Sequence, residues 1–424
     1  MNSLFSKKYW LLLFAGSVCS VSSCLFYSSN GATLQSMIVT AVFVLMTMFM
    51  KQENQLYMIA LSLPNTKALA LGGISASILI CVVAVMWNYI KRNKRASIPM
   101  TAIILLFYCI QYLIRSNDVL MGIVMPIKTM VNILFFLLLT SNMKIAQKSF
   151  DTGLKASISM FVGITSALVA SIFGNSELGG RFTIAGNDSN MISIEIAFVI
   201  AYLSVAYFTR KQISNIAYLG IACALGLMSM MCSSRMGILL YIFVIIVSLS
   251  LNARRVGKTM MMIVVLGVAG VSFLLLPFGQ SLIDGLLLRM EVLENAADIS
   301  NGRFEIWNEY FAVLNSNQLY WLFGLGSYAD KGLENMAHNF LLEDIAAYGI
   351  IGVILLYSTY VSIYRKQYRL SHIVNPFRWS LYYSMPFFVP IIGSLTLHGL
   401  GSIMITTMLY LGVLCMTGAV RRNV

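Results

Sequence analysis

The sequence predicts an all-α, polytopic integral membrane protein with about 12 to 14 transmembrane helices and one large loop outside the membrane. Three observations support this class. The chain of 424 residues is 58% hydrophobic and only 11% charged, and its mean hydropathy is +0.80. Apolar runs long enough to cross a bilayer recur along the whole length, and they are continuous rather than alternating. Basic residues fall in short segments between these runs.

Fourteen apolar runs are candidate spans, counted at about 20 residues for each crossing. The segment 54–71 is the weakest because Pro64 and Lys67 interrupt it. It also fits a re-entrant or interfacial piece. Counting it as a span keeps both chain ends and every basic cluster on one side. The runs are 9–27, 32–50, 54–71, 74–90, 97–115, 118–140, 153–173, 190–208, 214–231, 237–251, 259–277, 340–362, 380–398 and 402–420.

The formal net charge of +13 is a topology signal rather than a nucleic-acid footprint. Most of the 29 Lys and Arg residues cluster in short connections, such as KK at 7–8, KRNKR at 91–95 and RR at 421–422. Short cytoplasmic loops carry this excess of basic residues. We therefore expect both termini in the cytoplasm and no nucleic-acid partner.

This topology divides the chain into three parts, namely residues 1–277 with a short outer loop at 174–190, a large outer loop at 278–339, and C-terminal spans at 340–424. The large loop holds half of the 16 acidic residues. A loop of this length in a compact protein tends to be functional. We expect two helices in it. One is amphipathic over 281–297, and the other covers 301–315 and is capped by Ser300 or Asn301.

A histidine and an asparagine, His338 and Asn339, stand where the large loop re-enters the membrane. Helix N-termini carry unpaired N–H groups and favour anions. Gly349 and Gly352 follow within the span and are expected to let another helix pack closely.

Several arginines lie on the outer side, against the topology rule. Arg181, Arg235 and Arg303 all map to outer loops or outer span ends. Guanidinium groups hold phosphate oxygens in a bidentate fork, and an unperturbed histidine titrates near neutrality, as a general base requires. These arginines together with His338 predict a phosphate-bearing substrate and a base.

Each arginine also has a structural interpretation. Arg235 can extend to the interface as a lone cation. Arg303 can pair with Glu305 or Glu309, and Arg181 can form an ion pair within its own loop. Position alone does not decide between the two interpretations.

Motifs for metal or nucleotide chemistry are missing from the sequence. We find no cluster of ligands with metal-binding spacing, no Asp-x-Asp pair, and no phosphate-cradling glycine loop. We therefore expect no metal and no cofactor. Lys128 and Glu195 lie inside predicted spans, where they either pair with each other or line a polar cavity.

Four features in order resemble the O-antigen polymerase (Wzy) and O-antigen ligase (WaaL) superfamily of bacterial envelope enzymes. They are SSRMG at 233–237 with the earlier GRF at 180–182, GRFEIW at 302–307, WLFGLGSY at 321–328, and HNFLLEDIAAYGIIG at 338–352. The resemblance covers residues 170–365 in order and spacing. It implies a metal-independent glycosyltransferase of the inner membrane with its site on the periplasmic side.

The resemblance also implies roles for the candidate residues. His338 would activate the attacking sugar hydroxyl, and Arg235 and Arg303, helped by Arg181, would hold the pyrophosphate. Asn339 and Trp307 complete the expected substrate-binding set. Trp307 suits stacking on a sugar, although packing within the loop is a commoner use of such a side chain.

The substrates implied are oligosaccharides on a polyprenyl carrier such as undecaprenyl pyrophosphate, with a chain-length regulator as an expected partner. We favour a polymerase that joins one lipid-linked repeat unit to another, in the synthesis of O-antigen, capsule or exopolysaccharide. The alternatives are the ligase, which transfers the glycan to lipid A-core, and a flippase for the same lipid-linked units. A flippase is less favoured, because transporters often carry internal repeats and none is visible here.

Overall fold

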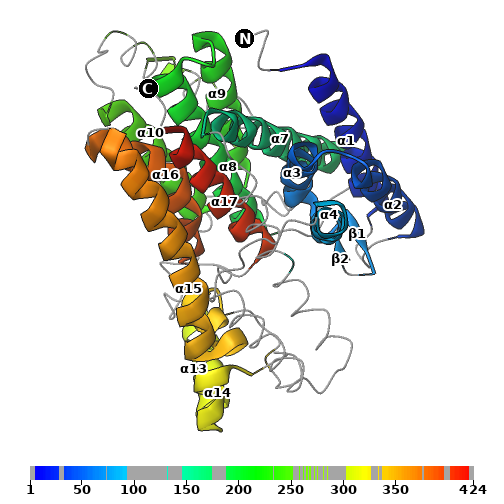
Figure 1. Cartoon of the computed structure of the whole chain (residues 1–424), viewed down its shortest axis with the longest axis vertical. Coiled ribbons are helices and arrows are strands. Elements are labelled where there is room, and N and C mark those ends of the chain that lie inside the picture. Colours follow the sequence, from blue (N-terminus) through cyan, green and yellow to red (C-terminus); the bar gives the residue numbers. More distant parts are fainter. Residues whose placement is uncertain are drawn as a thin grey trace.

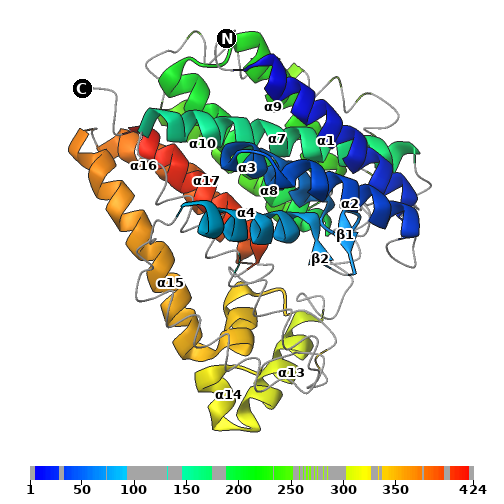
Figure 2. The same ribbon diagram turned by 45° about the vertical axis from the view of Figure 1, so that its right-hand side comes forward.

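The computed structural model describes residues 5–27, 33–72, 74–92, 131, 146–173, 188–232, 234–251, isolated positions between 257 and 284, 302–325, 333, 337–374, 377–395 and 402–419. These residues form a bundle of helices and a smaller lobe at one end of it (Figures 1 and 2). Helix α1 (Lys7–Phe26) begins, and helices α15 (Phe340–Val374) and α17 (Ile403–Ala419) end, at the opposite end of the bundle from the lobe. Basic residues begin α1 and lie in the last part of α15, which agrees with a positive-inside arrangement.

The bundle is built from helices on both sides of the lobe in the sequence. Its elements are α1 (Lys7–Phe26), α2 (Leu34–Met48), α3 (Gln52–Ser62), α4 (Ala76–Arg92), α7 (Ala146–Phe173), α8 (Ser189–Val205), α9 (Asn215–Met231), α10 (Arg235–Leu251), α16 (Phe377–Ser394) and α17 (Ile403–Ala419). A π-helical turn, η2 (Ala206–Arg210), extends α8. The lobe consists of α13 (Arg303–Asn315), α14 (Gln318–Phe323) and the first part of α15 (Phe340–Val374), which continues into the bundle.

Four helices of the described residues are long and apolar enough to cross a membrane. These are Lys7–Phe26, Ser149–Ser171, Ser189–Arg210 and Phe340–Arg369, and shorter apolar helices accompany them. The all-α membrane class is thereby confirmed. The full span count is not, since the runs 97–115, 118–140 and most of 259–277 lie outside the described residues, as does most of the helix expected at 281–297.

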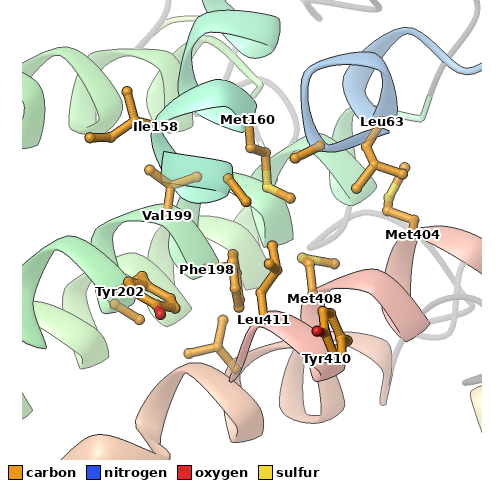
Figure 3. Packing of buried hydrophobic residues seen from close by; sticks show 14 of the residues in the cluster. Leu63, Ile158, Met160, Phe198, Val199, Tyr202, Met404, Met408, Tyr410 and Leu411 are labelled. Carbon is orange, nitrogen blue, oxygen red and sulfur yellow. The ribbon is translucent and has the colours of Figure 1, made fainter. Parts of the chain in front are cut away.

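Helix α8 is the centre of the bundle. Every residue from Met191 to Val205 is buried, as expected for a helix that is apolar all round. Its Phe198, Val199 and Tyr202 meet side chains of α7 and α17 (Figure 3). By contrast, α1, α2 and α10 carry large apolar side chains that are strongly exposed, which suits a surface in contact with lipid.

The segment 54–71, which we counted as a span, is not one continuous helix. Helix α3 ends at Ser62 and a short 3-10 helix, η1 (Leu63–Asn65), follows. Pro64 lacks the N–H that an α-helical ladder requires there. The chain then forms a two-stranded antiparallel hairpin, β1 (Ala70–Leu71) with β2 (Ile74–Ser75). The prediction of a span is therefore wrong for the second half of this segment.

Two details of the lobe also differ from expectation. Helix α13 begins one or two residues later than predicted, because Gly302 occupies the N-cap in a left-handed conformation and makes no side-chain cap bond. Gly349 does let another helix, α14, approach closely, but it does so from a break in α15 and not as part of a packing face with Gly352. It takes a non-helical conformation (φ 68°, ψ 171°) and breaks α15, while the nearest contact of a side chain at Gly352 would be Tyr348 of its own helix.

Candidate functional site

The lobe has a small hydrophobic core of its own. Its fully or nearly buried members come from α13, from the segments around it and from the first turns of α15: Tyr310, Leu314, Leu325, Leu333, Ala337, Leu342 and Ala346. Ile306, Trp307 and Trp321 pack against them. This core holds α13 beside the start of α15, where the predicted catalytic residues lie.

The WLFGLG and GIIG motifs meet in a backbone-to-backbone contact. A methyl group at Gly349 would collide with the carbonyl of Leu322, and one at Gly324 would collide with the carbonyl of Ala347. The N–H of Leu325 donates to the carbonyl oxygen of Ala346 at 2.7 Å. Both glycines have positive φ, which other residues adopt only at a cost. The break in α15 therefore receives the end of α14.

Two aromatic side chains of α13 hold Ala337, the residue before His338. The indole Nε1–H of Trp307 donates to the carbonyl oxygen of Ala337 at 2.7 Å. Tyr310, one turn further along α13, forms a hydrogen bond with the backbone of the same residue. Burial, with a smaller contribution from the nearby charge of Glu343, raises the pKa of Tyr310 to about 12. Trp307 thus positions the loop, and its indole N–H is committed to this structural role.

His338 lies in an unusual conformation at the start of α15. Its φ is +50°, a left-handed value that few non-glycine residues adopt. Its backbone N–H donates to Oε1 of Glu343 at 3.1 Å. Residues held in sparsely populated backbone regions persist where the surroundings over-determine them, and they cluster at functional sites. Here Trp307 binds the carbonyl and Glu343 binds the N–H of the one peptide group that joins Ala337 to His338, and these two bonds supply that determination.

Asn339 caps the helix that follows. Its Oδ1 accepts hydrogen bonds from the N–H groups of Leu341 at 3.1 Å and Leu342 at 3.2 Å. This is the ordinary N-cap arrangement. The side-chain oxygen is therefore committed to the helix, and only the amide N–H groups of Asn339 are available to a substrate.

Two buried acids follow in the first turns of α15, and sequence reasoning missed both. Glu343 is 7% exposed and Asp344 is 2% exposed. Asp344 Oδ2 accepts a hydrogen bond from the hydroxyl of Tyr357 at 2.8 Å. The familiar capping box places its acid three residues after the cap, whereas Glu343 comes four after Asn339. Because of this one-residue difference, the sequence does not match the capping-box pattern.

Arg303 is the first residue of α13, half-buried and one turn before Trp307. Within the described residues it forms no ion pair, so the alternative of pairing with Glu305 or Glu309 is not seen. A cation at a helix N-terminus is electrostatically unfavourable. Helix stability therefore does not explain this arginine.

Arg235 occupies the matching position on α10, also as the first residue of its helix, and it is exposed. The preceding Ser234 accepts a hydrogen bond from the N–H of Gly237, and Gly237 lies tightly against Ser193 of α8. No hydrogen bond or ion pair links Arg235 to the lobe among the described residues.

The structure thus brings some of the predicted residues together. Trp307, His338 and Asn339 form one connected set, and Arg303 shares a helix face with Trp307. Arg235 lies on a separate helix, and Arg181 lies outside the described residues. Glu195 is fully buried in α8, and neither of its carboxylate oxygens has a hydrogen-bond partner in the described part of the chain. Its suggested partner, Lys128, is also outside that part.

The fold and this set of residues define an α-helical membrane protein with a lobe that carries a strained histidine beside an arginine-bearing helix. Residues 219–357 match the family model described as O-antigen ligase. The match covers about a third of the chain and contains Arg235, Arg303 and His338. It confirms the resemblance to the superfamily of O-antigen ligases and polymerases, whose members are membrane glycosyltransferase-like enzymes, and it does not separate the two activities. The comparisons with curated proteins and with solved structures returned no match.

Proposed function

We propose that the protein is a polysaccharide polymerase that joins polyprenyl-pyrophosphate-linked repeat units at the periplasmic face of the inner membrane. The observation that carries the proposal is the placement of His338. The peptide group that precedes it is fixed at both its polar atoms, by the bond of Trp307 to the carbonyl of Ala337 and by the bond of the His338 N–H to Glu343. His338 lies two residues before α15, which begins in the lobe and continues after the break at Gly349 into the bundle.

This position suits a substrate with two environments. The carrier lipid stays in the bilayer while its sugars face water, so a transferase must work at the boundary. Because α15 starts in the lobe and continues into the bundle, we propose that its first residues lie at that boundary. An ordered base there lowers the entropic cost of bringing two large glycans together.

The chemistry we propose is a single displacement. The hydroxyl of the acceptor sugar attacks the anomeric carbon of the donor, and its proton passes to the imidazole of His338. The bond between the anomeric carbon and the pyrophosphate oxygen breaks, and the pyrophosphate leaves on its lipid. Arg303 and Arg235 offset the negative charge that grows on the leaving group. Inversion at the anomeric carbon follows, and retention in the product linkage would contradict this scheme.

The first test compares surface polysaccharide from a host that lacks this gene with the same host carrying wild type or His338→Ala. A polymerase predicts that the deletion leaves lipid A-core with a single repeat unit, and that only wild type restores the ladder. A ligase predicts loss of every repeat from lipid A-core while long lipid-linked chains accumulate. A full ladder with His338→Ala would show that this histidine is not the base.

Purified protein in liposomes separates the enzyme from a flippase. Elongated glycan is the expected product. Movement of lipid-linked units across the bilayer without new linkages would overturn the enzymatic proposal.

A further inference from the structure

An apolar groove of about 310 Å³ lies between α9 and α10, and Gly267, one of the isolated described positions that follow them, also lines it. Its walls include Cys223, Gly226, Tyr241, Ile242 and Ile246. The one hydroxyl among these five donates to the carbonyl oxygen of Ala222 at 2.7 Å and is therefore already satisfied. The groove thus presents a surface for hydrocarbon and offers little to a polar ligand.

The groove opens toward the surroundings of the bundle. Ile242 is 46% exposed and Ile246 is 56% exposed. Both α9 and α10 are apolar helices, and α10 exposes large apolar side chains such as Leu239 and Phe243, which suits contact with lipid chains. An occupant would enter sideways from the bilayer.

A positive charge stands over one end of this groove. Ile242 and Ile246 follow Arg235 by about two and three helical turns, so all three lie on the same face of α10. The other wall, α9, ends just before Arg235 begins α10, and Met230 near that end also lines the groove. The guanidinium of Arg235 has no hydrogen bond or ion pair within the described residues.

We infer that this groove binds the first isoprene units of the polyprenyl chain of the donor, with its diphosphate at Arg235. The inference rests on the proposed function, since it assigns a place to the lipid part of that substrate. A cation above an apolar groove is complementary to an amphiphile with an anionic head and a long hydrocarbon tail. The donor fits because a guanidinium fork matches its diphosphate and because it carries a single chain rather than the paired chains of a phospholipid.

The test is photolabelling of the full chain in nanodiscs with a polyprenyl diphosphate that carries a diazirine near its head. In wild type we expect labelled peptides from α9 and α10, and competition by unlabelled polyprenyl diphosphate but not by excess phosphatidylglycerol. Gly226→Leu fills the groove and should reduce labelling about tenfold, because tail binding within a membrane depends on packing rather than on exclusion of water.

The chain offers matched controls. Gly220 lies on the same helix, and an added side chain there would meet nothing within 4 Å, so Gly220→Leu should label like wild type. A side chain at Gly226 would lie 3.3 Å from the hydroxyl of Tyr241, so Gly226→Leu can also disturb the fold. Ile242→Trp is therefore the second blocking variant. Phe243→Trp is its control, since Phe243 is equally exposed but does not line the groove.

The outcomes separate this inference from the proposed function. If wild type elongates glycans and the blocking variants label like their controls, the groove is not the lipid site and the inference fails. Equal competition by phosphatidylglycerol would also overturn it, by showing an ordinary bilayer lipid in the groove. If labelling depends on the groove but wild type forms no new linkage, the proposed function fails instead.

Discussion

Gly324 and Gly349 face each other across the contact that joins α14 to the broken helix α15. A Cβ built at Gly324 would lie 2.9 Å from the amide nitrogen of Gly349 and closer still to the carbonyl of Ala347. The two glycines come from separate motifs of the sequence and meet only in the folded lobe. Their contact fixes where α15 bends, and hence where its N-terminal residues lie.

Replacement of either glycine by alanine is expected to disrupt the lobe. Gly324→Ala and Gly349→Ala each place a side chain at positive φ with ψ near 175° and 171°, a region that is essentially restricted to glycine and costs about 1–3 kcal/mol, and each also collides with backbone. Gly302→Ala is the control, because Gly302 has φ +75° but nothing within 4 Å of an added methyl. Hydrogen exchange across the lobe should rise strongly in the first two variants and slightly in the control. Equal effects in all three would show that the contact itself contributes nothing.

Trp307→Phe is expected to raise the free-energy barrier of glycan elongation, seen as a lower kcat, by more than it lowers the free energy of unfolding. It keeps most of the ring but removes the donor to the buried carbonyl of Ala337, which costs about 1–3 kcal/mol. His338 then loses one of its two anchors. Glycan elongation by purified protein measures kcat, and thermal unfolding measures stability.

Trp321→Phe is the matched control for that variant. Trp321 donates its indole N–H to Oδ1 of the exposed Asn315 at 3.0 Å, where water can replace it. We expect a change in stability within about 0.5 kcal/mol and an unchanged kcat. A similar loss of activity in both variants would contradict the positioning role of Trp307.

Tyr310 should make the lobe sensitive to alkaline pH. Its pKa in the folded protein is about 12, against 10.0 as the ordinary value. The folded state therefore holds this proton more tightly than the unfolded state does, and the associated stability is intact below about pH 10 and declines until about pH 12. Tyr310→Phe should remove this part of the decline. Unfolding followed by tryptophan fluorescence at several pH values measures it, and an identical profile in both proteins would refute the assignment.

Arginine at positions 303 and 235 is expected to act through its fork and not only through its charge. Arg303→Lys and Arg235→Lys keep the charge but lose bidentate contact with phosphate oxygens. We expect kcat/KM for the lipid-linked donor to fall about a hundredfold, by analogy with the loss of one transition-state donor. Arg369→Lys, in the last part of α15 and far from the lobe, should have no effect. Full activity in both lysine variants would show that the reaction requires only a positive charge at these positions and not the bidentate contact of a guanidinium.

Part of this protein followed from the sequence alone. Hydropathy and charge predicted an all-α membrane protein, because a bilayer accepts few other structures and penalises charge strongly. The order of the GRFEIW, WLFGLG and HNF segments was enough to indicate the superfamily. Helix α13 was predicted to within two residues of its start from the candidate caps Ser300 and Asn301, although Gly302 occupies the cap position.

Other features depended on contacts between distant residues, and no local pattern contains these. After Ser62 the segment 54–71 does not continue as an α-helix; it forms a short 3-10 helix and ends in strand β1 of a hairpin at the edge of the bundle (Figures 1 and 2). A glycine in an apolar run is compatible with a packing face as well as with a break in the helix. The contact of Gly349 with the backbone of Leu322 and Phe323, which only the folded structure shows, accompanies the break in α15. The left-handed backbone of His338 is costly by itself. It is retained because Trp307, Tyr310 and Glu343, which the fold brings to it, hold the backbone of Ala337 and the N–H of His338.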